Sequence, residues 1–246
     1  MSNVHIYSGH DTRLQLTDAL LMYRSPDGAV YATTHPVQVE TDNPARKIIG
    51  AGVPLTKTAL AEFAKAVGTA TTFDGFVPDN LLYTAPNMIA WWTPASVRKC
   101  WFRSKNKFIG TCVAEVAHPA LVFVAVPGDW FVFALAESAR PTPETKLQHA
   151  PHFNVWDGGR ICTGNVDLPG AADTTTMAEY ERAFFSSNFT HPNRQGATKH
   201  KGGMTSLWRA QIKQANAEQM QRALRPAGET VRKAIERIAT RFSKSL

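Results

Sequence analysis

Five short apolar segments follow one another between residues 88 and 135, and each has the length of a β-strand. Segments of this length that are rich in Val, Phe and Trp favour strands over helices. Pro127-Gly128-Asp129 marks a hairpin between the last two of them. The chain is therefore expected to contain a sheet of consecutive antiparallel strands. The five segments are Met88–Thr93, Val97–Arg103, Thr111–Ala117, Leu121–Val126 and Trp130–Leu135.

Three tryptophans lie in these segments, and two interpretations of them are open. Trp91, Trp92 and Trp101 are most simply explained as aromatic residues of a sheet and its core. As platforms for stacked nucleic-acid bases they need a basic groove beside them. We favour the core interpretation, because large aromatic residues are common in strands. Basic residues do occur nearby: Arg98, Lys99, Arg103, Lys105 and Lys107.

Apolar residues at three- and four-residue spacing predict helices on both sides of the strands. Thr176 and Glu179 have the spacing of a capping box, so the second helix is expected to begin there. Pro226-Ala227-Gly228 separates the last two helices. Strands and helices together predict the α+β class. The four expected helices cover residues 54–67, 176–187, 205–224 and 229–242.

The first 50 residues are expected to form strands and turns. Val4–Tyr7 alternates between polar and apolar residues, and a longer apolar run ends at Tyr23. Ser25-Pro26-Asp27-Gly28 is a turn signal, because Pro fixes φ and Gly accepts a left-handed corner. A returning strand is expected from Ala29 to Val39. Three regions are thus predicted: an N-terminal β-hairpin extension over residues 1–50, a core over 51–190, and a basic loop with C-terminal helices over 191–246.

The C-terminal part of the chain is strongly basic. The whole chain has 27 Lys and Arg residues against 20 Asp and Glu, a formal net charge of +7. From Thr205 to Leu246, nine Lys and Arg residues stand against three Glu residues. Basic surface favours acidic partners, either nucleic acid or an acidic protein face. The alternative is a solvated helix face, and an amphipathic helix of this kind either binds a partner or packs within the fold.

Composition narrows the class of protein. An apolar content of 43% and a charged content of 19% are typical of a globular protein. The longest apolar run, Ala120 to Ala136, is interrupted by Pro127-Gly128-Asp129, so no membrane span is expected. The N-terminal residues lack a basic region followed by an apolar core, so no signal peptide is expected. Three cysteines without a close pair predict a reducing cytoplasm and neither a disulfide framework nor a zinc site.

One stretch combines residue types suited to acyl transfer, and it runs His152-Phe153-Asn154-Val155-Trp156-Asp157-Gly158-Gly159-Arg160-Ile161-Cys162. A thiol is a strong nucleophile at neutral pH, because part of it is already thiolate. An Asn side chain, here Asn154, donates N–H groups to a developing oxyanion. The paired glycines accept positive φ, so the backbone is able to turn sharply and present Cys162. The alternative is a small buried Cys that follows a turn.

These residues carry a resemblance to a known family. His-Phe-Asn, a short loop with Gly, and then Ile161-Cys162 resembles the active-site signature of ubiquitin-conjugating enzymes, which have His-Pro-Asn and Ile-Cys at the same ten-residue separation. Pro141-Thr142-Pro143 is similar to the proline-rich turn before that family's last strand. Phe153 departs from the family's Pro, and Val166-Asp167-Leu168-Pro169-Gly170 stands where the family has Trp-Ser-Pro. The more specific resemblance is to a divergent bacterial branch, PRTRC system protein B.

The resemblance implies a ubiquitin-conjugating-like fold, in which helices flank a four-stranded antiparallel β-meander, here with an N-terminal β extension and a C-terminal helical tail. Five apolar segments against four strands is a mismatch. It further implies that Cys162 accepts a ubiquitin-like protein as a thioester and transfers it to an amine. Asn154 then stabilises the oxyanion, and His152 fixes the loop through hydrogen bonds. Asp157 and Asp167 are both candidates for orienting or deprotonating the amine.

Partners follow from the same resemblance. The bacterial branch is encoded beside a ThiF-like adenylating protein, a small ubiquitin-like protein and a JAB-type metallopeptidase. Nucleic acid is a further partner through the basic tail, and no membrane partner is expected. The chain itself is expected to need no cofactor and no metal, because His191 and His200 have no acidic or Cys residue to complete a site.

Two other classes of function fit the sequence. A thiol hydrolase pairs Cys162 with a His as a dyad, and that His must contact the thiol. A non-catalytic scaffold holds nucleic acid or a partner protein through the basic tail and makes no use of the thiol.

Overall fold

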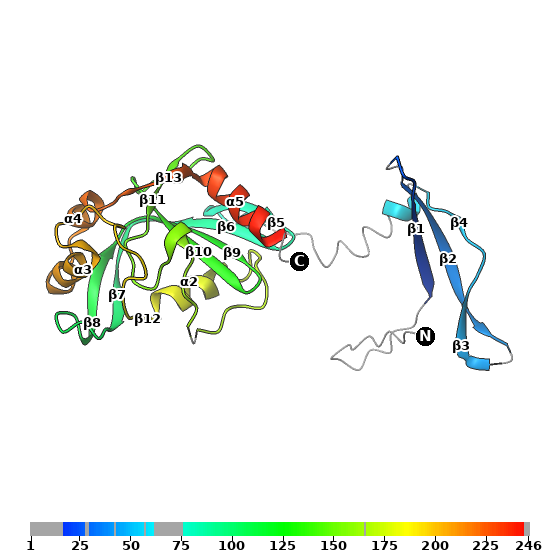
Figure 1. Ribbon diagram of the computed structural model, residues 1–246, viewed down its shortest axis with the longest axis horizontal. Coiled ribbons are helices and arrows are strands. Elements are labelled where there is room, and N and C mark those ends of the chain that lie inside the picture. The colour runs from blue at the N-terminus through cyan, green and yellow to red at the C-terminus, as the bar shows by residue number, and fades with distance from the viewer. Residues whose placement is uncertain are drawn as a thin grey trace. The chain divides into compact units, whose positions relative to one another are not determined.

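The computed structural model describes residues 17–27, 30–41, 43–56, 58–61, 76–164 and 166–243. Contacts divide the chain into two units, Met1–Thr72 and Phe73–Leu246, and Figure 1 shows the elements of each. Antiparallel sheets and a few helices make the predicted α+β structure. The predicted region boundaries at residues 50 and 190 stay predictions.

The first unit contains a small antiparallel sheet. Its central strand, β2 (Val30–Glu40), pairs with β1 (Asp18–Arg24) in a hairpin whose turn includes Pro26-Asp27. The same strand pairs with β3 (Asn43–Ile49) along its second half and with β4 (Val53–Pro54) along its first. The predicted hairpin is therefore confirmed, and two further strands extend it.

Two predictions for the first unit fall wholly or partly outside the described residues. Val4–Tyr7 lies outside them. Of the helix expected over residues 54–67, residues 54–56 and 58–61 are described: Pro54 belongs to β4, and 58–61 are helical. Thr56 caps this turn as predicted, because its hydroxyl accepts a hydrogen bond from the Ala59 amide at 3.1 Å.

The second unit is built on a six-stranded sheet with the order β13-β11-β10-β9-β6-β5. Every described pairing in it is antiparallel. The strands from β5 to β11 lie in sequence order, and β13 adds an edge from the C-terminal region. Their bounds are β5 (Leu81–Ala85), β6 (Met88–Thr93), β9 (Leu121–Val126), β10 (Asp129–Leu135), β11 (Lys146–His149) and β13 (Pro226–Thr230).

A second sheet joins β7 (Ser96–Arg103), β8 (Thr111–His118) and the short parallel strand β12 (Asn188–Phe189). All five predicted segments are strands, within one residue of their expected bounds. The expectation that neighbouring segments pair is confirmed for β7 with β8 and for β9 with β10. It is wrong for the other two neighbouring pairs, because β6 pairs with β9.

The β6–β9 and β7–β8 pairings are two halves of one long ribbon. Thr93 lies opposite Leu121, and Ser96 lies opposite His118, so the register continues across the gap without a slip. Proline has no N–H group to donate to a ladder, so it interrupts the pairing without ending the strand. Two predicted connections are therefore bends, and the five segments make three long strands, against the four of the expected meander. The interrupting residues are Pro94 and Pro119.

The six-stranded sheet is buried on both faces. Along β9, Phe123 belongs to the buried cluster that includes Phe184, and the next residue, Val124, belongs to the cluster that includes Ile238. This alternation follows the two-residue period of a strand. Figure 1 shows α2 (Met177–Phe185) and α5 (Val231–Ser243) at this sheet. Helix α2 belongs to the first cluster and α5 to the second. Helix α3 (Gly203–Lys213) shares the first cluster but lies beside β8 of the second sheet.

Trp91 of β6 is a core residue, as we favoured. It is 1% exposed, and its ring stacks on Phe123 with centroids 5.3 Å apart. Its indole Nε1 donates a hydrogen bond to Glu181 Oε1 at 3.0 Å, which satisfies the buried N–H group. Trp92 and Trp101 are half-buried. The structure therefore offers no base-stacking platform at Trp91.

Residues 205–224 form two helices, α3 and α4 (Ala217–Arg222), and the prediction of a single helix is wrong. Asn216 begins the second helix, because its side chain accepts a hydrogen bond from the Gln219 amide at 2.8 Å. The fully buried Gln211 side chain binds the Asn216 backbone at both its N–H and its carbonyl. Apolar spacing alone does not reveal this capped break.

Pro226-Ala227-Gly228 belongs to strand β13 and is not a simple helix break. Pro226 lies opposite Gln148 of β11, so this segment is an edge strand of the sheet. The helix that follows, α5, begins two residues later than expected. Its Val231, Ala234 and Ile238 side chains are buried. The last helix is thus a packing helix of the core, and the prediction of an appended helical tail is wrong for it.

Helix α2 is confirmed, but its predicted capping box is wrong. Thr176 has helical dihedrals, with φ −95° and ψ −5°, and its side chain makes no capping hydrogen bond to the helix. Its hydroxyl instead donates to the Asp173 carbonyl at 2.9 Å and closes the turn before the helix. No helix in the described part of the chain is long and apolar enough to cross a bilayer.

Candidate active site

The site loop, residues 152–162, follows β11 and folds back on itself. At its base, the Cys162 N–H group donates to the Asn154 carbonyl at 2.7 Å. This ladder places the backbone of Cys162 directly beside that of Asn154, although eight residues separate them. Two further cross-links continue it toward the tip: a bridge between Val155 and Ile161, and a bond of 2.7 Å from Trp156 N–H to Arg160 O.

Two glycines make the tip of the site loop, within the 3₁₀ turn η1 (Asp157–Gly159). Gly158 has φ 73° and Gly159 has φ 83°, as predicted for a sharp turn. A Cβ at position 159 would lie 2.7 Å from the Phe133 ring and 2.9 Å from the Val132 carbonyl oxygen. Gly159 is therefore required both for the turn and for the close approach of the loop to β10.

The returning arm of the site loop lies against the open start of β10. Strand β11 pairs with β10 only over Phe133–Leu135, which leaves the first residues of β10 free. Ile161 N–H donates to the Trp130 carbonyl at 2.9 Å. Arg160 Nε binds both carboxylate oxygens of Asp129, at 2.8 and 2.9 Å. Cys162 is therefore carried by a segment that is hydrogen-bonded to the sheet.

Asn154 has an unusual backbone. Among the described residues it is the only non-glycine residue with a positive φ, at 62°. Asn tolerates the left-handed region better than most residues, because its short polar side chain bonds locally. Residues in such conformations concentrate at functional sites, where surrounding contacts enforce them.

The Asn154 side chain ties the site loop to the segment that follows α2. Its Oδ1 accepts hydrogen bonds from the Thr190 hydroxyl at 2.6 Å and the Thr190 amide at 3.2 Å. Its Nδ2 donates to the Asn188 carbonyl at 2.8 Å. An amide nitrogen carries two hydrogens, and this is its one bond within the described part of the chain. One Nδ2 hydrogen of Asn154 therefore remains for a ligand, while the bonds to Asn188 and Thr190 hold the loop.

The three thiols differ in their surroundings. Burial raises the pKa of Cys100 to about 12, and burial also raises the pKa of Cys112. A raised pKa reduces the thiolate fraction, so both are poor nucleophiles at neutral pH. Cys162 is partly exposed and is not paired in a disulfide. Its position at the base of the site loop suits attack on a carbonyl group from solvent.

His152 begins the site loop inside the protein core. It is 0% exposed, and its Nε2 lies 3.0 Å from His118 Nδ1 of β8. Burial lowers the pKa of His152 well below its ordinary value and lowers the pKa of His118 to about 3. Both rings are therefore neutral at pH 7, so one donates its N–H and the other accepts. The neighbouring Phe153 is fully buried as well.

The two buried histidines are in contact with each other and with Cys100, and no bond joins them to Cys162 among the described residues. His118 Nε2 lies 3.6 Å from Cys100 Sγ, which continues the line Cys100, His118, His152 through the core. Neutral buried rings suit the expected role of His152, which is to fix the loop through a hydrogen bond. A hydrolytic dyad of His152 with Cys162 has no support, because the recorded hydrogen bond of His152 is to His118.

The two candidate carboxylates lie in different places. Asp157 is at the loop tip, with its side chain 85% exposed and its Oδ1 3.1 Å from Arg194 Nε. Asp167 follows Cys162 by five residues and lines a groove of about 530 Å³ against α2, together with Glu179 and Arg182. Asp157 is thus tied to a cation at the far end of the loop, whereas Asp167 faces open space.

The match to known families covers this whole region. A family model described as prokaryotic E2 family D matches residues 57–227, more than half of the chain. The chain belongs to prokaryotic E2 family D. It is therefore a ubiquitin-conjugating-like protein of the prokaryotic type. No curated protein and no solved structure matches the chain.

Sequence reasoning missed three residues of this family D site. Thr190 and the Asn188 carbonyl hold the Asn154 amide from 36 and 34 residues away. His118 holds His152 across 34 residues. None of them belongs to a motif, because each acts through a contact between distant parts of the chain. A single sequence carries no signal for such pairs.

Metal-ligating residues do not gather in the part of this family D chain that the structure describes. Within the described ranges, no group of three His, Cys, Asp or Glu side chains is placed to hold a metal ion. His191 lies beside the site, where its Nδ1 is 2.9 Å from the Thr190 hydroxyl. Its backbone carbonyl accepts the Asn154 N–H at 3.0 Å, so its contribution to the site is structural.

Proposed function

We propose that this family D protein accepts the C-terminus of a ubiquitin-like protein as a thioester on Cys162 and transfers it to an amine. A ThiF-like adenylating enzyme supplies the activated carrier, in the cytoplasm. One observation supports this most: the site loop holds a partly exposed thiol beside Asn154, through a 2.7 Å backbone bond, within the family match. Within family D, the motif favours the branch known as PRTRC system protein B.

The chemistry is a pair of acyl transfers. Cys162 thiolate attacks the thioester carbonyl held by the adenylating enzyme; a new S–C bond forms, and that enzyme's sulfur leaves as a thiolate. An acceptor amine then attacks the Cys162 thioester. The N–C bond forms, Cys162 Sγ leaves as a thiolate, and the amine proton passes to a base. The product is an amide, and the ATP is consumed by the partner enzyme.

Each site residue has a separate role in this proposal. Asn154 donates its remaining Nδ2 hydrogen to the tetrahedral oxyanion, in a geometry that the Asn188 and Thr190 bonds already fix. His152 is a positioning residue, because it touches only the core. Asp167 accepts or orients the amine proton, since it lies in open space near Cys162 in the chain. Asp157, tied to Arg194, is the less suitable group.

The scaffold alternative loses support from the C-terminal helices. Three of their arginines are already paired with glutamates, and α5 is built into the core. Helix α5 is therefore part of the core and not a separate basic arm. The three ion pairs are Arg222–Glu218, Arg232–Glu144 and Arg237–Glu229.

Intact-mass analysis tests the proposal. The chain is incubated with a ThiF-like enzyme, ATP and candidate ubiquitin-like carriers, including those encoded beside it with a JAB-type metallopeptidase. The expected product is a one-to-one adduct that disappears with reductant. Cys162→Ala abolishes it, whereas Cys112→Ala, which removes another partly exposed thiol, does not. An adduct that survives in Cys162→Ala, or that resists reductant, rejects the proposed nucleophile.

A further inference from the structure

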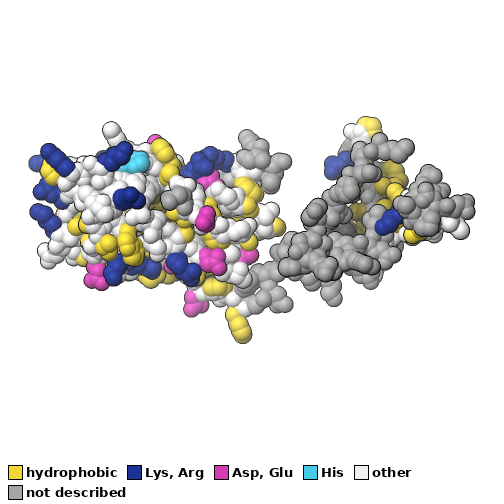
Figure 2. Space-filling model, turned by 90° about the horizontal axis from the view of Figure 1, so that it is seen from below, with side chains coloured by type: hydrophobic (Ala, Val, Ile, Leu, Met, Phe, Trp, Pro, Cys, Tyr) yellow, Lys and Arg dark blue, Asp and Glu magenta, His cyan; other side chains and the backbone are white. Residues whose placement is uncertain are grey.

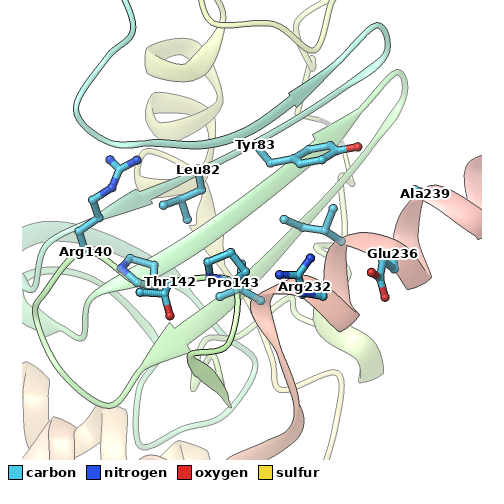
Figure 3. A pocket seen from close by; sticks show the side chains of 11 residues that line it. Leu82, Tyr83, Arg140, Thr142, Pro143, Arg232, Glu236 and Ala239 are labelled. Atoms are coloured by element: carbon cyan, nitrogen blue, oxygen red, sulfur yellow. The ribbon is translucent and has the colours of Figure 1, made fainter.

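A groove of about 1020 Å³, lined mostly by residues with polar or basic side chains, opens next to the site loop. It lies between the turn that joins β7 to β8, the segment after β12, and the first turn of α3. Its volume is about twice that of the cavity shown in Figure 3, of about 530 Å³, which Leu82 and Tyr83 of β5 and residues of α5 line. The residues that matter here are Arg103, Lys105, Asn106, Thr190, His191 and Thr205.

One wall of this groove is continuous with the candidate active site. The Thr190 hydroxyl donates to Asn154 Oδ1 at 2.6 Å, and the His191 carbonyl accepts the Asn154 N–H at 3.0 Å. On its other side, Asn154 accepts the Cys162 N–H at 2.7 Å. Asn154 therefore links the wall of the groove to the backbone of Cys162 through these bonds.

The charge of the groove is positive and uncompensated. Arg103 and Lys105 are exposed, and neither has an ion-pair partner among the described residues. No Asp or Glu is among the residues that line the groove. Figure 2 shows Lys and Arg side chains gathered at the end of the second unit where Figure 1 places α3, α4 and the β7–β8 turn. The arginines of the C-terminal helices differ, since three of them are paired.

The turn that carries these cations is preorganised. Ser104 N–H donates to the Gly110 carbonyl at 2.8 Å, and Asn106 Oδ1 accepts the Phe108 N–H at 2.9 Å. Ile109 anchors the turn in the core. Groups that are already held in place lose less entropy when a ligand binds. The turn therefore presents its cations as a recognition surface.

We propose that this groove binds an acidic segment of the acceptor protein, one whose Asp and Glu side chains flank the lysine that attacks Cys162. The inference rests on the proposed function for the last step only, because the binding itself needs no thioester. Carboxylates match the unpaired guanidinium and ammonium groups. Nucleic acid fits less well, because no Phe, Tyr or Trp side chain lines the groove as a platform for stacked bases.

Fluorescence anisotropy tests the binding with the full chain. The probe is a labelled peptide in which one lysine is flanked by Asp and Glu, and its comparator has Asn and Gln at the same positions. We expect the acidic peptide to bind at least about tenfold more tightly, and the difference to shrink at high salt because charges are screened. Equal binding of the two peptides overturns the proposal.

Charge reversal assigns the binding to the groove. The double variant Arg103→Glu, Lys105→Glu is expected to weaken the acidic peptide at least about tenfold. Lys233→Glu, an exposed lysine of α5, is the matched control and is expected to leave binding unchanged. Equal losses in the two variants overturn the assignment. A single-stranded oligonucleotide that binds more tightly than the peptide and is lost in the double variant identifies a nucleic-acid site instead.

The groove and the proposed function fail in different experiments. If the Cys162 adduct forms but transfers equally fast to the acidic and the neutral peptide, the groove proposal is wrong and the thioester remains. If the acidic peptide binds the groove but no adduct forms with any carrier, the acceptor surface stands and the catalytic proposal is wrong. Circular dichroism of each variant shows that it is folded.

Discussion

One end of the site loop is buried and the other is partly exposed, although the two ends are only ten positions apart. At one end, His152 is 0% exposed and bonded to a neutral His118. At the other end, Cys162 is partly exposed and bonded through its backbone to Asn154. The first end resembles the interior of any domain, and the second resembles a reactive surface.

This difference shows that one end of the loop anchors it in the core and the other end presents the thiol. Burial of the His152 end fixes the start of the loop against β8, and the glycine turn returns the chain to β10. Cys162 is then held by main-chain bonds, so its thiol needs no packing to stay in place. Reactive residues on loops are effective when a rigid scaffold positions them. The predictions below separate the stability of one end from the chemistry of the other.

The largest effect is expected from acid, and it acts at the buried end. Burial lowers the pKa of His118 to about 3, against an ordinary value of 6.5. Between these values the unfolded chain binds a proton that the folded chain does not, so stability falls as the pH drops below about 6.5 and levels off near 3. We expect a loss of about 3–5 kcal/mol from this ring alone, measured as urea unfolding free energies across pH.

A matched pair of variants identifies the source of this pH dependence. His118→Gln removes one of the two buried rings and should reduce the slope between pH 6.5 and about 3, while His152, whose pKa burial also lowers, keeps its own share. His191→Gln, which removes an exposed ring, is the control variant. Identical slopes in the two variants would show that the buried pair is not responsible.

The next largest effect is expected at the tip of the loop. Gly159→Ala places a methyl group against the Phe133 ring and should cost about 2–4 kcal/mol of unfolding free energy. Gly158→Ala has the same left-handed strain, but its nearest neighbour is Arg237 Nη1 at 3.4 Å. It should therefore cost only about 1 kcal/mol. Equal costs would mean that backbone strain, and not the approach to β10, makes Gly159 necessary.

A third prediction concerns the chemical end alone. Asn154→Asp keeps an acceptor for Thr190 and tolerates the positive φ, but it has no N–H to donate. Loading of Cys162 should proceed, and discharge to an amine should slow about a hundredfold to a thousandfold in single-turnover assays. Thr190→Val removes one loop bond and leaves the Asn154 N–H groups. If Thr190→Val slows discharge as much, Asn154 acts by holding the loop and not by donating to the oxyanion.

The smallest effects separate the two carboxylates. Asp167→Asn should slow discharge about tenfold while loading and stability stay unchanged, because its carboxylate faces open space. Asp157→Asn removes the charge of an exposed carboxylate that is paired with the mostly buried Arg194, so unfolding free energy should change by about 1 kcal/mol or less. Its discharge rate should match that of the unmodified chain. The reverse pattern would assign the amine proton to Asp157.

Much of the fold could be predicted where the signal was local. The five apolar segments of the second unit became strands within one residue of their expected bounds, because strand-length apolar runs bounded by polar residues are visible in the chain itself. Pairing could not be predicted in the same way. The continuous register through Thr93 and Ser96 depends on partners 22 or more residues away, and no local pattern records it.

The helices show the same limit. Gln211 breaks the expected helix over residues 205–224 because its buried side chain bonds to Asn216. The strand at Pro226 exists because Gln148 of β11 lies beside it. In both places the local pattern was correct for an isolated segment, and a tertiary contact overruled it.

The sequence by itself determined which residues form the site loop, where its glycines turn it, and which thiol lies at its end. These features follow from the steric freedom of Gly158 and Gly159 and from short spacings between neighbours. Only the tertiary structure decided that His152 pairs with His118, that Asn154 is held by Thr190, and that Arg103 and Lys105 meet the site across a groove. Burial and pairing depend on contacts between residues far apart in the chain, so they form only when the chain folds.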